Sequence, residues 1–407
     1  MDRNRKSQFL DVKFPDDFFW GTATASHQIE GNNTNNDWWD GEKKGLPRSG
    51  QACDSYNRYE EDFNLAKKMH NNAHRFSIEW SRIEPKEGKF DEKEIEHYRK
   101  IVYALRLRGL EPFVTLHHFT IPIWLAKKGG WTNKNISRYF ERYVKFVAER
   151  IGKDVKFWAT INEPNVVTSI GYIAGFWPPF RKKDFSGCIL SLLNMIKAHK
   201  HAYKVLHKYN SHAQVGIDMH IAYYEPGSKM FGFGSSVLAD IAKYYSHYWF
   251  LDKIKEFQDF LGINYYRHFQ VSIMGIHEGR GKISDFEWEI YPRGIYKIAK
   301  EAFQRYRKPI YILENGIADA DDDQRPDFIK SHLMWLQRAI SEGVDIKGYF
   351  HWSLLDNYEW AEGFTKRFGL VEVDFNSFKR TVRHSGKVYA KICKNNGFNS
   401  KKTIEAD

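Results

Sequence analysis

Short β-rich runs alternate with amphipathic stretches along almost the whole chain of 407 residues, and this alternation constrains the fold most. Eight such runs can be counted: Phe18 to Ala23, His74 to Ile78, Pro112 to His118, Phe157 to Asn162, Val215 to His220, Phe260 to Tyr266, Pro309 to Leu313 and Ile346 to Trp352. Helix-like stretches separate or follow them, beginning at Ser55, Asp91, Ser137, Ile189, Ser235, Gly294, Pro326 and Ser385. Repeated βα units in this number predict an α/β fold, a closed (β/α)8 or TIM barrel. We expect one domain over residues 1–407, with its core at about 14–397.

Composition narrows the class of protein. Hydrophobic residues (42%) and charged residues (28%) suit a large folded core. The net charge is +11, but the basic residues are scattered, which argues against nucleic acid as a partner. Cys53, Cys188 and Cys393 lie far apart, which predicts no disulfide framework and a reducing compartment. Neither an export signal nor an apolar membrane span is visible, so we expect a cytoplasmic protein without a membrane partner.

Polar and aromatic residues gather where the predicted strands end. In a TIM barrel, the C-terminal strand ends and the loops after them form the functional face. The residues at these ends are His118, Asn162, Glu163, Asn264, Tyr266, Glu314, Asn315 and Trp352. We therefore expect their side chains to surround one cavity.

Two of these residues are glutamates on the fourth and seventh predicted strands. Those strands lie nearly opposite each other in an eight-stranded ring, so Glu163 and Glu314 are predicted to face each other. Either residue alone is more typical of a helix cap or a rim salt bridge. Together they favour glycosidic bond hydrolysis, in which one carboxylic acid protonates the leaving oxygen and the other carboxylate attacks or orients water.

The neighbours of the two glutamates suggest different roles. Glu163 lies in the apolar company of Trp158 and Pro164, and desolvation of this kind keeps a carboxylic acid protonated. Glu314 has to stay ionised instead. Arg75 and Tyr266 are the candidates for the cation and the hydroxyl donor that would achieve this.

The chain resembles glycoside hydrolase family one, the β-glucosidase family, from about Phe14 to its C-terminal helix. Four motifs carry the resemblance: "FFWGTATASHQIEGN", "TINEPN", "YILENGIADADDDQRPDFI" and "GYFHWSLLDNYEWAEGFTKRFGLVEVDF". This resemblance implies a single-domain barrel that hydrolyses β-glycosides with retention and uses no cofactor. Retention requires the two carboxyl groups to be about 5–5.5 Å apart.

The resemblance also assigns individual residues. It makes Glu163 the general acid/base and Glu314 the nucleophile that forms a glycosyl-enzyme. The residues that would bind the sugar are Gln28, His118, Asn162, Trp352, Glu359, Trp360 and Phe368. Arg75, Tyr266 and Asn264 would support the nucleophile Glu314. Arg75 and Tyr266 would flank it, and Asn264, from the same motif, has an expected structural role.

No metal site is expected. His117 and His118 are adjacent on a predicted strand, so only one of them can face the cavity, and His118 is the matched one. His199 and His201 are two residues apart on a helix and do not share a face.

The sequence departs from the family pattern in two short segments and at two positions where tryptophan is usual. Few residues separate "WFLDK" from "FLGINYY", and the segment from Arg267 to Glu287 is short. This predicts a more open flank beside the sixth strand, with an extra cavity. Gly41 and Phe119 stand where the family usually has tryptophan, which removes aromatic bulk and affects the aglycone side.

The leading hypothesis is a retaining exo-β-glycosidase for small β-glucosides or oligosaccharides, with galactosides and fucosides left open. Glu359 and Trp360 argue against the 6-phospho-glycoside branch, and an acid at Glu163 argues against the thioglucosidase branch. The alternatives are a carbohydrate-binding pseudoenzyme weakened by its short loops and a basic nucleic-acid module. The sequence does not reveal the oligomeric state.

Overall fold

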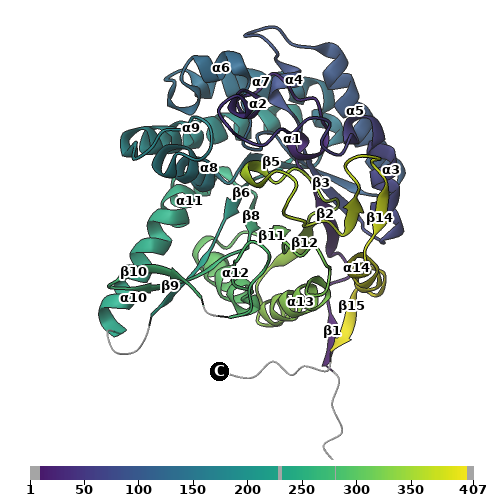
Figure 1. The fold of residues 1–407 in the computed structure, drawn as a ribbon, viewed down its shortest axis with the longest axis vertical. Helices are drawn as coiled ribbons and strands as arrows, with labels where there is room; N and C mark the ends of the chain where they lie inside the picture. The colour runs from purple at the N-terminus through teal and green to yellow at the C-terminus, as the bar shows by residue number, and fades with distance from the viewer. Residues whose placement is uncertain (1–9, 228–231, 280, 401–407) are drawn as a thin grey trace, which may run out of the picture.

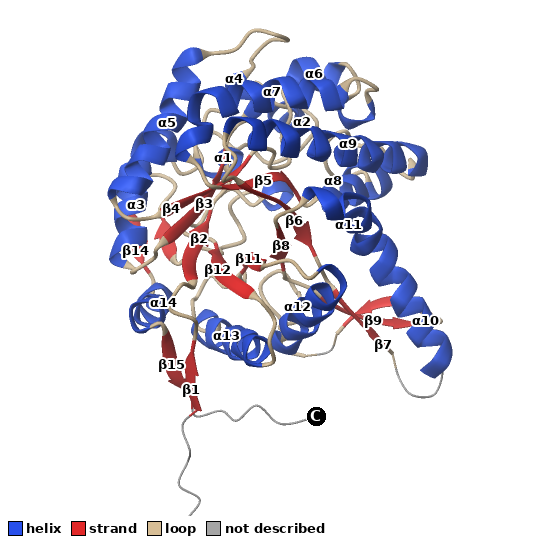
Figure 2. Ribbon diagram, turned by 180° about the vertical axis from the view of Figure 1, so that it is seen from behind, coloured by secondary structure: helices blue, strands red, loops and turns tan. Residues whose placement is uncertain are grey.

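The computed structural model describes residues 10–227, 232–279 and 281–400. Eight parallel strands close into a central barrel, and helices surround it (Figure 1 and Figure 2). In order around the barrel the strands are β11 (Ile310–Asn315), β12 (Ile346–Trp352), β2 (Phe19–Ala23), β3 (Ala73–Ser77), β4 (Glu111–Thr115), β5 (Phe157–Asn162), β6 (Gln214–His220) and β8 (Phe260–Asn264). Each predicted β-rich run corresponds to one of these strands, so the (β/α)8 fold is confirmed.

β3 ends one residue earlier than predicted, at Ser77, and two other strands end earlier still. β4 ends at Thr115 rather than at His118, and β8 ends at Asn264 rather than at Tyr266. After β4 the chain turns at Phe119, whose φ of 71° lies in the left-handed region, so an extended strand cannot continue there. His118 and Tyr266 therefore lie in the βα loops, where a TIM barrel carries its functional side chains.

Helices cover most of the outside of the barrel, and all eight predicted helical stretches are present, one of them as two helices. They are α3 (Ser55–Lys68), α5 (Glu92–Leu107), α7 (Ile136–Ile151), α9 (Phe185–Tyr209), α10 (Gly232–Lys243), α11 (Trp249–Ile254), α12 (Pro292–Tyr306), α13 (Arg325–Ser341) and α14 (His384–Asn395). α9 begins before the predicted Ile189 because Gly187 N donates a capping bond to Asp184 Oδ1 (2.8 Å). The stretch predicted from Ser235 runs through α10, the π-helical segment η5 (Tyr244–Tyr248) and α11.

Shorter elements occupy the loops. The short helices and turns are α1 (Ser26–Ile29), α2 (Asp37–Glu42), α4 (Trp80–Ile83), α6 (Ile123–Lys127), α8 (Pro164–Thr168), η1 (Gly130–Thr132), η2 (Gly152–Asp154), η3 (Ser169–Ala174), η6 (Lys255–Phe257) and η7 (Trp360–Glu362). The small sheets are β7–β9–β10 (Tyr223–Pro226, His268–Ser272, Gly275–Glu278), β13–β14 (Val371–Val373, Arg380–Val382) and β1–β15 (Leu10–Lys13, Gly397–Ser400). The sheet β7–β9–β10 lies beside α10 on one flank of the barrel (Figure 1).

Apolar side chains form two separate cores. The larger one includes residues of both the strands and the surrounding helices. The smaller one fills the barrel interior and contains Phe113, Phe157, Tyr311 and Phe350. The rings of Phe113 and Phe157 are nearly parallel, with an interplanar angle of 3° and a centroid distance of 4.2 Å. These side chains close the barrel interior, as the packed layers of other TIM barrels do.

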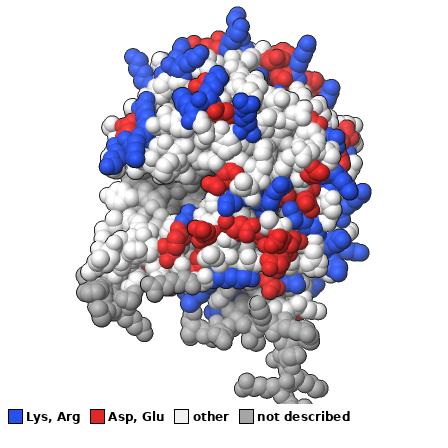
Figure 3. Space-filling model, in the orientation of Figure 1, with Lys and Arg blue, Asp and Glu red and all other residues white. Residues whose placement is uncertain are grey.

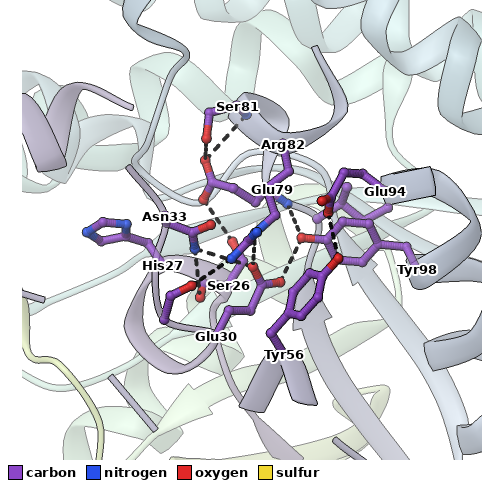
Figure 4. A network of polar contacts seen from close by, with 12 residues as sticks. Ser26, His27, Glu30, Asn33, Tyr56, Glu79, Ser81, Arg82, Glu94 and Tyr98 are labelled. Atoms are coloured by element: carbon purple, nitrogen blue, oxygen red, sulfur yellow. Dashed lines mark hydrogen bonds and ion pairs between the residues drawn. The ribbon is translucent and has the colours of Figure 1, made fainter. Parts of the chain in front are cut away.

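A buried polar network ties the first βα loop to the second (Figure 4). Ser26 Oγ donates to Glu79 Oε2 (3.1 Å), and Arg82 Nε donates to Glu30 Oε2 (2.8 Å). Ser26 and Glu30 flank Gln28 in the loop after β2, whereas Glu79 and Arg82 follow β3. Buried networks of this kind favour one arrangement of the chain, so Gln28 is presented from a fixed loop.

Across the three described ranges, no helix combines the length and the apolar character that crossing a bilayer requires.

Candidate active site

Two buried glutamates stand at C-terminal strand ends on nearly opposite sides of the barrel. Glu163 directly follows β5, and Glu314 lies near the end of β11. The pairing register of each strand shifts just before its glutamate, and such irregularities re-aim side chains beside active sites. Glu163 also has a left-handed φ of 45°, which is uncommon outside glycine and typical of functional sites. Asn162 and Glu163 can therefore line the same cavity although they are adjacent in sequence.

The cavity at this end of the barrel has a volume of about 1090 Å³. Nine of the predicted site residues line it: His118, Asn162, Glu163, Tyr266, Glu314, Trp352, Glu359, Trp360 and Phe368. Gln28, Arg75 and Asn264 do not line the cavity, but each donates a hydrogen bond to a residue that does. The structure thus brings all twelve predicted residues to one site.

Glu314 is held by a cation and a hydroxyl group. Arg75 Nη1 donates to Oε1 of Glu314, and the Tyr266 hydroxyl donates to Oε2 (2.8 Å). Arg75 Nη2 also donates to Asn162 Oδ1 (2.8 Å). Both predicted partners therefore contact Glu314, and charge-assisted bonds to both oxygens orient its carboxylate.

Asp218 on β6 is a site residue that the sequence analysis does not identify. Its Oδ2 atom lies 2.5 Å from Arg75 Nη2, and its side chain is buried. Burial raises the pKa of Asp218 to about 7, against the opposing effect of Arg75. The available signal is an acid inside the apolar run from Val215 to His220. Arg75 is thus shared between Asp218 and Glu314.

Glu163 has neighbours of a different kind. Its pKa is raised well above the ordinary range, first by burial and then by the charge of Glu314. Asn264 Nδ2 donates to Glu163 Oε1 (2.9 Å) and to Asn162 Oδ1 (3.1 Å). The sequence predicts Asn264 beside Glu314, and this is wrong for the side chain. The backbone of Asn264 does pair with that of Glu314, but its amide reaches Glu163.

Trp158 does not supply the apolar surroundings predicted for Glu163. Successive strand side chains face opposite sides of a sheet. Phe157 belongs to the core inside the barrel, whereas Trp158 belongs to the outer core and donates its indole N–H to Val155 O (3.2 Å). The desolvation of Glu163 is therefore a property of its place in the cavity and does not come from Trp158.

One wall of the cavity, to which His118 and Glu359 contribute, is polar, and Gln28 lies directly behind it. Gln28 Nε2 donates to Glu359 Oε2 (3.3 Å), and burial, followed by the charge of Glu314, raises the pKa of Glu359 to about 8. Gln28 Oε1 and His118 Nδ1 are buried without a hydrogen-bond partner among the described residues. Buried polar atoms cost free energy unless another polar group meets them. This wall therefore suits a ligand rich in hydroxyl groups.

Aromatic rings form the other walls. The rings of Trp352 and Trp360 lie within 11° and 10° of parallel to the His118 ring, at centroid distances of 5.9 and 6.0 Å. Flat rings with polar edges provide apolar faces for a pyranose. His117 faces away from the cavity, as predicted, and accepts a hydrogen bond from Trp131 Nε1 (3.3 Å). In the described part of the chain, no group of three or more His, Cys, Asp or Glu residues could hold a metal.

The two positions where the family usually has tryptophan have different outcomes. Phe119 lines the cavity, with its ring centroid 4.9 Å from that of Trp360. Gly41 does not line it, and a Cβ atom there would lie 2.7 Å from Leu46 Cδ1. The predicted effect of Gly41 on the aglycone side is therefore not seen in the cavity, because Leu46 and Phe180 occupy the space beside Gly41. The cavity predicted beside the sixth strand is not a separate one: the cavity at the catalytic end itself extends there, to His220, Arg267 and Phe269.

Comparison with known proteins identifies the family. The family model described as Glycosyl hydrolase family 1 matches residues 10–254 and 250–398. This chain belongs to glycosyl hydrolase family 1. Family 1 enzymes are retaining glycosidases, so this chain is an O-glycoside hydrolase. Its two buried glutamates are the candidates for the pair of carboxyl groups that such enzymes use.

Relatives of this family 1 chain match over nearly their full length. Beta-glucosidase A of Thermotoga maritima is 36% identical, and the match covers 95% of this chain and 98% of that protein. The 1,4-beta-D-glucan glucohydrolase of Thermotoga neapolitana is 35% identical, with 95% and 99% covered. The solved structure of a beta-glycosidase from Pyrococcus horikoshii has a TM-score of 0.90 and 40% identity, covering 96% of this chain and 97% of that one.

Proposed function

We propose that this family 1 hydrolase removes terminal β-D-glucosyl residues from small β-glucosides, with galactosides and fucosides as further substrates to test. One observation carries the proposal: the two buried glutamates have different surroundings. Burial raises the pKa of Glu163, whereas Arg75 and Tyr266 donate hydrogen bonds to Glu314. The names of the relatives, beta-glucosidase and glucan glucohydrolase, support the same substrate class.

The proposed reaction is a double displacement. Glu314 attacks the anomeric carbon and forms a covalent glycosyl-enzyme, while the carboxylic acid of Glu163 protonates the departing oxygen. Glu163 then removes a proton from water, which hydrolyses the intermediate. The raised pKa of Glu163 supports its role as the acid, because it keeps the proton available in the first step.

The proposed sugar ligands surround this pair. Gln28, His118, Asn162 and Glu359 would bond the glycone hydroxyls, and the rings of Trp352, Trp360 and Phe368 would contact its apolar face. A solved complex of the related Thermotoga maritima beta-glucosidase with deoxynojirimycin supports a small sugar-like ligand; it has a TM-score of 0.89 and 35% identity, and covers 95% of this chain and 100% of that one.

The glycone is proposed to carry no phosphate. A 6-phospho-beta-galactosidase of Staphylococcus epidermidis is also a relative, with 33% identity covering 94% of this chain and 98% of that protein. The only cation among the described cavity-lining residues is Arg267, which already pairs with Glu278. Glu359 lies on the polar wall of the cavity, and a phosphate bound there would have no positively charged side chain to pair with.

Hydrolysis of an aryl β-glucoside tests the proposal directly. Wild-type protein is expected to release the phenol and to form β-glucose first, as observed by proton NMR. Glu314→Gln keeps the shape of the side chain and should lower the rate by about 10³-fold or more. Equal rates for the two proteins would contradict the proposal, and a panel of aryl β-glycosides would rank glucose, galactose and fucose.

The alternative of a carbohydrate-binding pseudoenzyme has no support, because both carboxylates are in place with their partners. The absence of a nucleic-acid partner stays a prediction. The cytoplasmic location also stays a prediction, and the three free cysteines support it.

A further inference from the structure

Glu79 is a buried carboxylate that the proposed reaction does not use. Its side chain is 0% exposed and lies just after β3, where it caps the first turn of α4. Most charged side chains of this protein lie on its surface, and Figure 3 shows many of them on one face. None of the ion pairs among the described residues includes Glu79, since Arg82 pairs with Glu30 instead. A carboxylate buried in this way is costly unless hydrogen bonds satisfy it.

Donors from three βα loops supply these hydrogen bonds. Ser26 Oγ, from the loop after β2, donates to Oε2 of Glu79 (3.1 Å), and Ser81 Oγ, from α4 itself, donates to Oε1 (2.6 Å) (Figure 4). Thr120 Oγ1, from the loop after β4, donates to both oxygens (3.1 and 2.9 Å). Asn36 Nδ2, also from the loop after β2, reaches Oε1 at 3.5 Å. Because an ionised carboxylate only accepts hydrogen bonds, all these donors point at one group, which holds the three loops together.

Two of these loops carry residues that are proposed to bind the glycone. Gln28 lies on α1, two residues after the serine donor, and His118 lies two residues before Thr120. The chain between His118 and Thr120 is left-handed at Phe119, with a φ of 71°. The bond from Thr120 to Glu79 anchors this turn, which aims His118 into the cavity. Glu79 does not line the cavity itself, so it fixes the separation of Gln28 and His118 from behind.

Glu79 also reaches the aromatic wall of the cavity through two further side chains. Nδ2 of Asn36, which bonds Glu79, lies 3.0 Å from His27 Nδ1. Burial lowers the pKa of His27 to about 3, so its neutral ring can accept a hydrogen bond from Asn36. The His27 ring is within 14° of parallel to the Trp360 ring, with 5.8 Å between the centroids. Three of the side chains proposed to contact the glycone are thus supported by one carboxylate.

We propose that Glu79 is a positioning residue for the glycone: it fixes the relative positions of Gln28, His118 and Trp360, on which the affinity for the sugar ring depends. This inference rests on the proposed β-glycosidase function. Among the described residues, neither glutamate of the proposed reaction is a hydrogen-bond partner of Glu79. Loss of this support should therefore weaken binding of the sugar ring more than it slows the chemical step.

The first test measures the inhibition constant of deoxynojirimycin, a sugar mimic without an aglycone, with a nitrophenyl β-D-glucoside as the substrate. Thr120→Val keeps the shape of the side chain and removes one donor to Glu79. Loss of one hydrogen bond should raise both the inhibition constant and KM by about 5- to 10-fold, with kcat lowered by less than about threefold. Glu79→Gln, which turns one acceptor into a donor, should change both constants in the same direction. Constants that stay at the wild-type values in both variants would overturn the inference.

Two further variants separate positioning from a general loss of stability. Thr120→Ser restores the hydroxyl group and should return both constants to within about twofold of the wild-type values. Glu84→Gln is the matched control, since Glu84 is a second carboxylate beside α4 that is 0% exposed. Its carboxylate accepts from Trp80 Nε1 (3.0 Å), Gly88 N (2.8 Å) and Arg142, and not from the loops that carry the sugar ligands. This control should lower the unfolding temperature without changing the inhibition constant, and an equal rise in the control would reduce Glu79 to a structural role.

The choice of aglycone gives an independent readout. Nitrophenyl and methylumbelliferyl β-D-glucosides share the glycone, so Glu79→Gln should lower kcat/KM for both by the same factor, within about twofold. A loss that depends on the aglycone would place the effect elsewhere in the cavity and contradict the inference. Wild-type protein that neither binds deoxynojirimycin nor hydrolyses any aryl glycoside would refute the proposed function itself. An active wild type with unaffected variants would refute only the role of Glu79.

Discussion

Oδ2 of Asp218 lies 2.5 Å from Nη2 of Arg75 inside the barrel. The same guanidinium donates to Glu314 through Nη1 and to Asn162 through Nη2. Asp218 does not line the cavity, so it acts on the reaction only through its neighbours. It is best described as a positioning residue that fixes Arg75 and adds a negative charge behind the two glutamates.

Asp218→Asn is expected to lower kcat/KM by about 10- to 100-fold, because Arg75 loses one of its anchors and small misplacements at a site cost large rate factors. The charge of Asp218 also contributes to raising the pKa of Glu163. Its removal should therefore lower that pKa and move the alkaline limb of the kcat/KM profile to lower pH. Measurement of kcat/KM as a function of pH for wild type and Asp218→Asn tests both the loss of rate and the shift of the alkaline limb.

Asp62→Asn provides the matched control for that experiment. Asp62 and Arg380 form a second buried ion pair, with side chains 3% and 1% exposed, away from the cavity. This substitution should reduce thermal stability without moving the pH profile. An equal shift of the limb in both variants would show that Asp218 has only a structural role.

Asn264→Leu should move the alkaline limb in the opposite direction. The amide of Asn264 lowers the pKa of Glu163 through its hydrogen bond, so a residue of similar size without that donor should raise it. One hydrogen bond is worth about 1 kcal/mol, which corresponds to a shift of up to about one pH unit. A limb that stays in place, or that moves to lower pH, would contradict the contact between Asn264 and Glu163.

Glu163→Ala is expected to lose about 10²- to 10⁴-fold in rate and to regain part of it with azide, for substrates with good leaving groups. Azide can attack the glycosyl-enzyme on Glu314 without a general base. The product should be the β-glycosyl azide, identified by NMR. The control is Glu314→Ala, which forms no glycosyl-enzyme, and a β-azide from that variant would reverse the assigned roles.

Phe113→Ala should lower the free energy of unfolding by about 3–5 kcal/mol, since it removes a buried ring that stacks on Phe157 inside the barrel. Phe185→Ala removes a ring that is 63% exposed and should change stability by less than about 0.5 kcal/mol. Thermal unfolding of the two variants measures the difference. Similar transition temperatures would show that the barrel interior contributes little to stability.

The sequence predicted the barrel because local periodicity reports which residues form strands and helices. It also placed Glu163 and Glu314 at one rim, since parallel strand ends meet there. The sequence does not show which side chains contact each other across the barrel. The partner of Asn264, the outward direction of Trp158 and the space filled around Gly41 all depend on side chains distant in sequence. The sequence does not identify Asp218, because an isolated acid in a strand does not show which cation it contacts in the fold.

The pairing of β1 with β15 has a practical consequence. Leu10–Lys13 lies antiparallel to Gly397–Ser400, so the two ends of the described chain leave the barrel side by side (Figure 1). β1 leads into the first residues of β2, which places this ladder toward the end of the barrel opposite the cavity. A tag, a fused protein or a solid support attached through either terminus would therefore leave the entrance to the cavity free for substrate.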